Sequence, residues 1–127
     1  MPTPETLERF IALVEANAHA EAVEAFYAPD VSMRENHSPP RIGRDEAVAR
    51  ERAVMAKARS ITSQCVRPVC VNGDHVAIRW IFQFAWPDGT CTHMEEVAWQ
   101  RWEGERLVEE TFFYDPAQRV PRITAVG

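Results

Sequence analysis

The chain has 127 residues, with 14 Lys and Arg against 19 Asp and Glu, which gives a formal net charge of −5. Hydrophobic residues make up 46 % of the sequence, the ordinary balance of a globular protein, and the length predicts that residues 1–127 form one domain. The acidic excess argues against nucleic acid and anionic membranes as main partners, because both require a basic surface.

The N-terminal segment and the cysteines bear on location and cofactors. Residues 1–5 have neither the basic region nor the apolar run of a signal peptide, and no segment approaches the ~18–20 apolar residues of a membrane span. Cys65, Cys70 and Cys91 are odd in number, which predicts reduced thiols in a cytoplasmic protein. The sequence has no zinc-type spacing of Cys and His and no glycine-rich phosphate loop, so we expect neither a metal nor a cofactor.

Two helices are predicted at the start of the chain. Thr3 is a suitable N-cap, with Pro4 in the first helical position. Apolar residues then recur at positions i, i+3, i+4 and i+7, which indicates one buried helical face. These residues are Leu7, Phe10, Ile11 and Val14. After a break at 17–19, a second short helix with Tyr27 on its apolar face is expected to end at residues 28–30, because a proline there interrupts the ladder.

The middle of the chain predicts a weak strand, a loop and a third helix. Residues 31–36 alternate weakly, as in a short strand, and residues 38–43 contain two prolines and a glycine, which are typical of a loop. Residues 45–58 are rich in Ala, Glu, Arg and Met, all of which favour a helix.

The second half has the two-residue period of β-strands. Strands are predicted over 62–71, 75–86, 91–102 and 106–114, with a tight hairpin turn at 72–74. Four aromatic side chains share one face of the second of these strands: Trp80, Phe82, Phe84 and Trp86. Three helices followed by an antiparallel meander predict an α+β domain in which the helices cover one face of the sheet.

Acidic residues interrupt the last two predicted strands. Because side chains alternate, either Glu95 or Glu96 faces the covered side of the sheet, and likewise either Glu109 or Glu110. A carboxyl group beside aromatic rings loses solvation, which raises its pKa toward the range useful for acid–base catalysis. The alternative is that each acid pairs with an arginine of a neighbouring strand; the available partners are Arg79, Arg101 and Arg106.

The histidines offer weaker candidates. Glu35 and His37 are two residues apart, so their side chains point the same way if the strand persists. Such a pair could transfer protons, or it could lie in solvent at the edge of the loop. His19 lies near a turn, where we expect it to be exposed, and His93 is expected to form a structural pair with Glu95.

Four segments, in this order and spacing, resemble the nuclear transport factor 2-like superfamily. Residues 26–31 (FYAPDV) and 40–47 (PRIGRDEA) are similar to its opening motifs. Residues 101–108 (RWEGERLV) are similar to its last hairpin, and residues 113–116 (FYDP) to its usual ending. Within the superfamily the chain most resembles the SnoaL-like, or polyketide cyclase-like, domains, and the resemblance covers residues 5–116.

The resemblance implies a cone-shaped barrel, in which a strongly bent antiparallel sheet wraps around three helices and leaves a pocket open at one end. This is the nuclear transport factor 2-like, or cystatin-like, fold. Homodimers through the outer sheet face are common in the superfamily, and Val97 and Trp99 are too apolar for a face left in solvent. The superfamily contains both enzymes and non-enzymatic binders, so the fold alone determines no reaction.

Ketosteroid isomerase belongs to this superfamily, and its functional positions can be compared one at a time. Its catalytic base falls at Glu35, so a carboxylate is kept. Its tyrosine donor falls at Phe10 and its protonated aspartate at Ala98, and neither side chain can donate a hydrogen bond. Because loss of one oxyanion donor lowers a rate by about 10²–10³-fold, steroid isomerase chemistry is not expected.

The same resemblance selects the candidate site residues. Four candidate catalytic residues would surround the pocket: Glu35, Glu96, Glu110 and Tyr114. Eight candidate substrate-binding residues would complete its wall: Phe10, Phe26, Asn36, Trp80, Phe82, Phe84, Ala98 and Phe112.

This set of residues predicts a domain that binds a small, largely apolar molecule. In an enzyme, Glu35 or Glu96 would abstract a proton, and Tyr114 or a protonated Glu110 would stabilise the oxyanion. The reaction would be a cofactor-independent isomerisation, aldol-type cyclisation or dehydration. The alternative function is a non-catalytic ligand-binding or dimeric scaffold domain, in which arginines balance the acids and aromatic side chains fill the interior.

Overall fold

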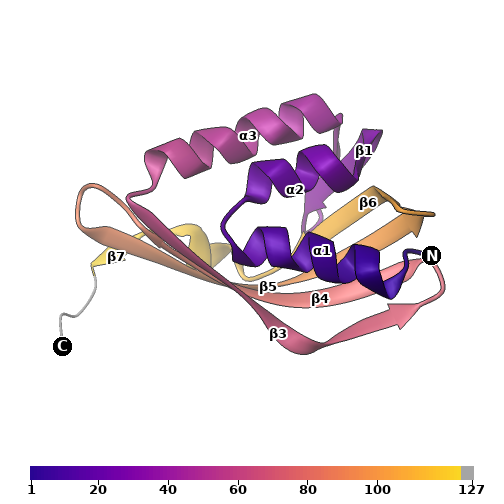
Figure 1. The fold of residues 1–127 in the computed structure, drawn as a ribbon. Helices are drawn as coiled ribbons and strands as arrows, with labels where there is room; N and C mark the ends of the chain where they lie inside the picture. The colour runs from indigo at the N-terminus through magenta and orange to yellow at the C-terminus, as the bar shows by residue number, and fades with distance from the viewer. Residues whose placement is uncertain (124–127) are drawn as a thin grey trace.

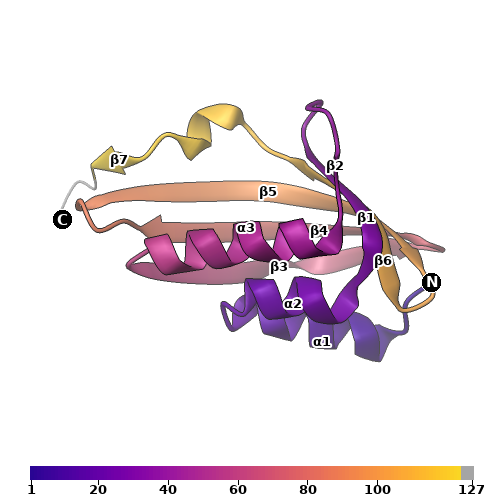
Figure 2. The same cartoon turned by 90° about the horizontal axis from the view of Figure 1, so that it is seen from above.

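Three helices lie side by side over one face of the sheet in the computed structural model, which describes residues 1–123 (Figures 1 and 2). They are α1 (Pro4–Glu15), α2 (His19–Phe26) and α3 (Arg44–Lys57). As predicted, Thr3 caps α1, because its side-chain oxygen accepts a hydrogen bond from the backbone N–H of Thr6. No helix among residues 1–123 is long and apolar enough to span a bilayer.

The sheet is built mainly from the second half of the chain. Its strands are β1 (Tyr27–Glu35), β2 (Arg41–Ile42), β3 (Ser60–Asn72), β4 (His75–Ala85), β5 (Thr90–Glu103), β6 (Arg106–Phe113) and β7 (Arg122–Ile123). A short 3₁₀-helix, η1 (Pro116–Arg119), lies between β6 and β7. The four long strands and their turns fall where the two-residue period predicts them.

The strand order is β2-β1-β6-β5-β4-β3, and β7 pairs with β5. The α+β fold and the strong curvature of the sheet are as predicted (Figure 1). Two features refine the predicted cone. The sheet is open, with β2 and β3 at its edges, and it is mixed, because β1 runs parallel to β6. A parallel pair needs a long connection, and here the chain passes through β2, α3 and strands β3 to β5 before it returns in β6.

The first part of β1 departs from the sequence prediction. Tyr27 is extended, with φ −84° and ψ 145°, and begins the strand instead of closing the helical face of α2. Pro29 lies inside β1, where the register with β6 shifts between Tyr27 and Ser32. A proline has no backbone N–H to donate, so it is tolerated where the ladder is interrupted. Strands β2 and β7 and the helix η1 were not predicted.

The hydrophobic core fills one end of the space between the helices and the sheet. The predicted face of α1 is buried there, and Phe10 packs edge-on against Phe26 and Trp102 at centroid distances of 5.8 and 5.9 Å. The side chains of Trp102 and Leu107 have no exposed surface. A packed core at this end leaves the opposite end of the curved sheet to form the site.

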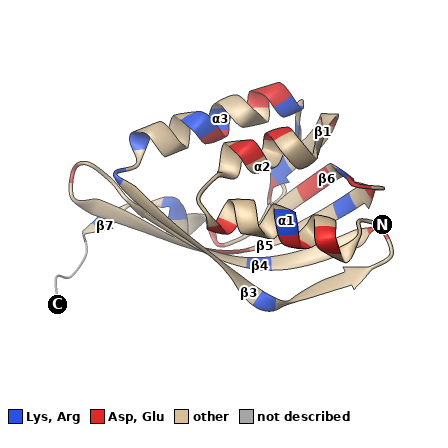
Figure 3. Ribbon diagram, in the orientation of Figure 1, with Lys and Arg blue, Asp and Glu red and all other residues tan. Residues whose placement is uncertain are grey.

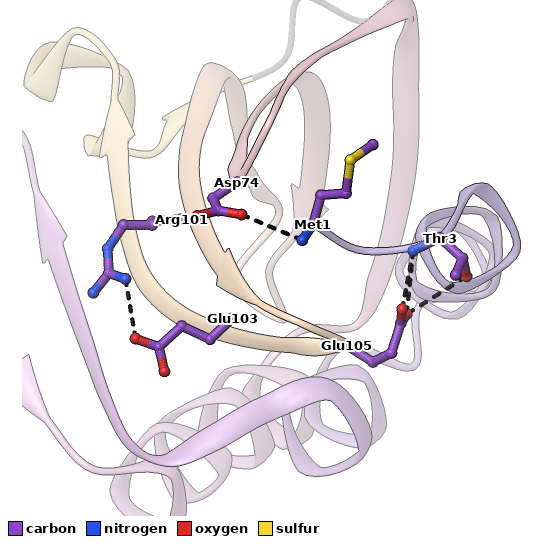
Figure 4. A network of polar contacts seen from close by, with 6 residues as sticks. All are labelled: Met1, Thr3, Asp74, Arg101, Glu103 and Glu105. Carbon is purple, nitrogen blue, oxygen red and sulfur yellow. Dashed lines mark hydrogen bonds and ion pairs between the residues drawn. The ribbon is translucent and has the colours of Figure 1, made fainter.

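Polar contacts fasten the N-terminus to this closed end (Figure 4). The N-terminal amino group of Met1 lies 3.2 Å from Oδ1 of Asp74, in the turn between β3 and β4. The backbone N–H of Thr3 donates to both carboxylate oxygens of Glu105, in the turn between β5 and β6. The start of α1 is therefore held against two hairpin turns.

Candidate active site

The aromatic side chains predicted to share a face of β4 line one wall of a cavity. The rings of Trp80 and Phe82 stack with centroids 5.5 Å apart and an interplanar angle of 18°. Phe84 and Trp86 stack in the same way, at 5.5 Å and 5°. Trp86 lies just beyond β4, and its indole N–H donates to the Thr92 hydroxyl at 2.8 Å. Two-residue alternation thus produces a continuous apolar wall.

The cavity has a volume of about 310 Å³ and lies between this wall and the three helices. That volume is at the lower end of the range for sites that hold small molecules. Its surface is mostly apolar, and its polar groups come from several elements. They include the carboxyl groups of Glu35, Glu51, Glu96 and Glu110.

Glu110 is the most buried of these acids, with only 3 % of its surface exposed. Its Oε1 accepts a hydrogen bond from the Tyr27 hydroxyl, and its Oε2 accepts one from Nε2 of Gln100 at 2.7 Å. The indole N–H of Trp102 donates to Oε1 of Gln100 at 2.9 Å, which turns the amide N–H₂ toward Glu110. Four buried side chains therefore form one connected polar network inside the core.

The network sets the acidity of its members. Burial raises the pKa of Glu110 to about 7, although the hydrogen bonds from Tyr27 and Gln100 act in the opposite direction. Burial and the adjacent charge of Glu110 raise the pKa of Tyr27 well above its usual value. Tyr27 thus remains a neutral donor while Glu110 titrates near neutral pH.

Glu96 lies on the same strand as Gln100 and on the same face. Burial, followed by repulsion from Glu110 and Glu35, raises the pKa of Glu96 to about 8. Among residues 1–123, no side chain or backbone group donates a hydrogen bond to its carboxyl group. Glu96 is therefore mostly protonated at pH 7 and can itself donate a hydrogen bond into the cavity.

A small residue separates the two inner acids along the sheet. Glu110 is paired with Gln100, and Ala98 lies between Gln100 and Glu96 on the covered face. Four residues along a strand correspond to about 13 Å between Cα atoms. Ala98 itself is fully buried in the core, so it separates the two carboxyl groups without lining the cavity.

Glu35 and Tyr114 lie at the outer end of the cavity. The Tyr114 hydroxyl donates to Oε1 of Glu35 at 2.9 Å, and Nη1 of Arg119 lies 3.3 Å from Oε2. Oδ1 of Asn36 accepts a hydrogen bond from the backbone N–H of Tyr114 at 3.0 Å. Partial burial and the bond to Glu35 raise the pKa of Tyr114. Both oxygens of Glu35 are thus already engaged.

His19 lines the cavity, contrary to the sequence expectation that it is exposed. Asn17 begins the chain of contacts that holds it, since its Nδ2 donates to the carbonyl of Ile61 and its Oδ1 accepts from the Ser63 hydroxyl at 2.7 Å. The single hydroxyl proton of Ser63 is used in that bond, so Ser63 accepts from Nε2 of His19 at 2.8 Å. This leaves Nδ1 of His19 facing Glu51, 3.8 Å from its Oε2.

The candidate site residues from the sequence do not all reach the cavity. Those that line it are Phe10, Glu35, Trp80, Phe82, Phe84, Glu96, Glu110 and Phe112. Tyr114 and Asn36 lie behind Glu35 and position it, while Phe26 and Ala98 are part of the packed core. Among residues 1–123, no group of three or more His, Cys, Asp or Glu side chains is arranged to hold a metal ion.

The SnoaL-like domain model matches residues 7–110 of the chain, which contain every strand of the sheet except part of β6 and the short β7. This chain is a member of the SnoaL-like domain family. No sequence among the curated proteins matches it.

Solved structures support the same fold. An NTF2-like protein of unknown function from Burkholderia pseudomallei superposes with a TM-score of 0.74 at 18 % identity, over 90 % of this chain and 91 % of that one. IdmH from Streptomyces antibioticus, named as a candidate polyketide cyclase, gives 0.70 at 18 % identity, over 90 % and 92 % of the chains. A LEH-like epoxide hydrolase from M. tuberculosis gives 0.73 at 11 % identity, over 90 % and 83 %. These identities establish the fold of the SnoaL-like domain and leave its reaction open.

Five polar residues that line the cavity of this SnoaL-like domain were not predicted from the sequence. They are His19, Tyr27, Glu51, Thr92 and Arg119. Tyr27 was predicted to lie in a helix, whereas it begins β1. Glu51 lies in α3, which has no clear apolar face, so the sequence pattern does not indicate where the Glu51 side chain points. Arg119 follows the last predicted strand. One available signal was Pro29, which disfavours a helical conformation at Ala28 and so favours a helix that ends close to Tyr27.

Proposed function

We propose that this SnoaL-like domain is an enzyme that binds a small, largely apolar molecule and carries out acid–base chemistry on it without a cofactor. The reaction class is enolisation leading to isomerisation, aldol-type cyclisation or dehydration. One observation carries the proposal: two carboxyl groups, Glu96 and Glu110, face an aromatic cavity with pKa values of about 8 and about 7 and without an arginine partner among residues 1–123. Catalytic acids and bases need pKa values in that range.

In the proposed mechanism Glu110 is the general base. Tyr27 and Gln100 donate to its two oxygens and hold the carboxylate in place. A C–H bond next to a carbonyl group breaks, its proton passes to Glu110, and the electron pair moves to the carbonyl oxygen. A second proton transfer from Glu110 to another carbon completes an isomerisation.

Glu96 stabilises the oxyanion in this mechanism. Its carboxyl group is mostly protonated at pH 7, so it can donate a hydrogen bond to the oxygen on which charge develops. The roles of the two inner acids are thus the reverse of those expected from sequence. Glu35 and Tyr114 are proposed to position the outer end of the ligand, because Arg119, 3.3 Å away, balances the charge of Glu35, whereas Glu110 has no such cationic partner among residues 1–123.

The test uses 2-tetralone, an apolar bicyclic ketone with an acidic α-hydrogen, and follows its exchange for deuterium by NMR. Glu110→Gln should lower the exchange rate by about 10²–10⁴-fold, the usual contribution of a general base. Glu96→Leu should lower it by about 10²–10³-fold, because one oxyanion donor is lost. Glu109→Gln is the matched control, since it removes the same charge from the other face of the same strand.

The pH profile gives a second readout. The rate should rise as Glu110 ionises near pH 7 and fall as Glu96 loses its proton near pH 8. Exchange that is unchanged in both Glu110→Gln and Glu96→Leu would contradict the assignment. Binding of 2-tetralone without any catalysed exchange would favour the non-catalytic ligand-binding function instead.

We also propose a homodimer formed through the outer face of the sheet. Val97, Trp99 and Phe113 are exposed there by 39, 48 and 41 %, and they lie side by side on β5 and β6. Burying these side chains against a second copy would remove apolar surface from water. Sedimentation should give a dimer at micromolar concentration, and Trp99→Glu should give a monomer; a monomeric wild-type protein would contradict the proposal.

A cytoplasmic location is proposed on the cysteines. Cys65, Cys70 and Cys91 are free cysteines, and unpaired thiols are typical of proteins in a reducing compartment. Thiol titration of protein isolated from its native cells should find all three reduced; a disulfide between any two would contradict this location.

A further inference from the structure

A second hollow of about 650 Å³ opens next to the cavity. It lies between β1, β2 and α3, and the two spaces share the side chains of Glu35, Glu51, Val54, Phe112 and Arg119. We call this outer hollow the vestibule. Because the shared residues form a common boundary, a ligand that fills the cavity and extends past this boundary enters the vestibule.

Arginines outnumber acidic residues in the lining of the vestibule. Four arginines and two glutamates line it: Arg34, Arg41, Arg50 and Arg119 against Glu35 and Glu51. The guanidinium group of Arg34 reaches Thr111 on the outer face of the sheet, so Arg41, Arg50 and Arg119 supply the positive charge of the hollow. The whole chain, by contrast, has a formal net charge of −5. Lys and Arg positions recur along α3, which supplies Arg50 (Figure 3). A hollow lined by one sign of charge raises the local concentration of ligands of the opposite sign.

Most of these arginines have no carboxylate partner. Arg119 pairs with Glu35 at 3.3 Å, but within residues 1–123 none of the other three forms an ion pair with a carboxylate. Arg34 makes one long hydrogen bond, 3.4 Å from Nε to the Thr111 hydroxyl. Elsewhere on the surface, exposed arginines do find acids, as Arg52 does with Glu24 at 2.9 Å. The guanidinium groups of Arg41 and Arg50 are therefore free to bind an anion.

We propose that the vestibule binds the carboxylate end of a ligand whose apolar body fills the aromatic cavity, so that the substrate class is an apolar carboxylic acid. This inference rests on the proposed function, because it assumes that the cavity is the ligand site. A carboxylate inside the cavity would be desolvated beside aromatic rings and two further carboxyl groups, which is unfavourable. At the vestibule it stays partly hydrated and meets planar guanidinium donors that match its geometry.

A single negative charge suits the vestibule better than a double one. Glu35 and Glu51 lie on its inner boundary and repel anions, and Glu35 already engages Arg119. This leaves a modest positive excess, which favours a carboxylate over a dianionic phosphate ester.

The test compares three probes with the same aromatic body: 2-naphthylacetate, its neutral amide and 2-naphthyl phosphate. Calorimetry at low salt should show that the carboxylate binds roughly tenfold more tightly than the amide and more tightly than the phosphate. High salt should reduce the difference, because partly exposed charges are screened. The double variant R41Q/R50Q should weaken carboxylate binding by roughly fivefold or more and leave amide binding unchanged.

Arg52→Gln is the matched control, because it removes the same charge from the same helix two residues from Arg50 but outside the vestibule. Equal affinity of the wild-type protein for carboxylate and amide would overturn the inference, as would equal weakening of both probes in the double variant. Tighter binding of the phosphate would overturn the choice of a carboxylate.

The same measurements separate this inference from the proposed function. A carboxylate preference that depends on Arg41 and Arg50, together with no catalysed exchange of 2-tetralone, would leave the vestibule in place and refute the enzyme. Exchange of 2-tetralone that depends on Glu110, with no preference for the carboxylate probe, would support the enzyme and refute the vestibule as a carboxylate site. Failure of all three naphthyl probes to bind would refute the cavity as the ligand site and the vestibule with it.

Discussion

Glu109 and Glu110 are adjacent in sequence, but their pKa values are shifted in opposite directions. Glu109 lies on the outer face of β6, where a hydrogen bond from Arg101 at 3.0 Å lowers its pKa. Glu110 lies on the inner face, where burial raises its pKa to about 7. The same contrast repeats on β5, where Glu95 is exposed and Glu96 has a pKa of about 8.

The face of the sheet on which an acidic side chain lies therefore determines its pKa and its partners, although the residue type is the same. Successive side chains of a strand point to opposite faces of the sheet, so here one lies in water and the next in the apolar environment of the cavity. The alternative prediction was that the acids of these strands pair with arginines. Such pairing is observed on the outer face, where Arg101 binds both Glu103 and Glu109.

The largest expected effect is on the pH dependence of stability. Glu96 ionises near 4.5 in the unfolded chain and near 8 in the folded one, so its contribution to stability is complete below pH 4.5 and is lost as the pH rises through 8. Glu96→Gln removes this titration. Between pH 4.5 and 8, the free energy of unfolding in urea should rise for the variant relative to the wild type by up to about 5 kcal/mol, since each pKa unit of the shift corresponds to about 1.4 kcal/mol.

Glu95→Gln provides the control for that measurement, because it alters the outer face of the same strand. Its stability should run parallel to that of the wild type over the same pH range. A Glu96→Gln curve that also runs parallel would mean that the inner face does not raise the pKa of Glu96, and the contrast between the faces would fail.

A smaller effect tests how Glu110 is held. Tyr27→Phe removes a hydrogen bond that lowers the pKa of Glu110, so that pKa should rise above 7. At pH 7 the exchange of 2-tetralone should slow by about tenfold, and the acid limb of the pH profile should move to higher pH. Tyr114→Phe is the matched variant, since its hydroxyl binds Glu35 instead. An acid limb that stays in place in Tyr27→Phe would count against Glu110 as the base.

Much of the fold could be predicted from local signals. The N-cap at Thr3, the apolar face of α1 and the strict alternation of β4 each depend on residues close in the chain. The parallel pairing of β1 with β6 could not be predicted in this way, because it joins residues about 80 positions apart, such as Met33 and Glu110.

The candidate site likewise contains residues that could be predicted from the sequence and residues that could not. Alternation limited the inner acids to two choices on each strand, and the superfamily resemblance selected Glu96 and Glu110. The donors that hold Glu110 were not foreseen, because Tyr27 comes from β1 and Gln100 points inward only through the register of β5 with β6. Side-chain partners across a sheet depend on register, which one sequence does not determine.

The smallest effect on activity is expected from a substitution on the outer face. Arg101→Gln removes the partner of Glu109, whose pKa should return upward to its ordinary value. Because that pKa is lowered in the folded protein, the pair contributes stability only above pH 4.5 and loses it as the pH falls. The ion pair is exposed and screened by water, so the exchange rate should change by less than about twofold and its pH profile should not move. NMR titration of Glu109 together with the exchange assay checks both statements. A shifted profile in Arg101→Gln would show that charge on the outer face reaches the inner acids, and the two faces could then no longer be treated as independent.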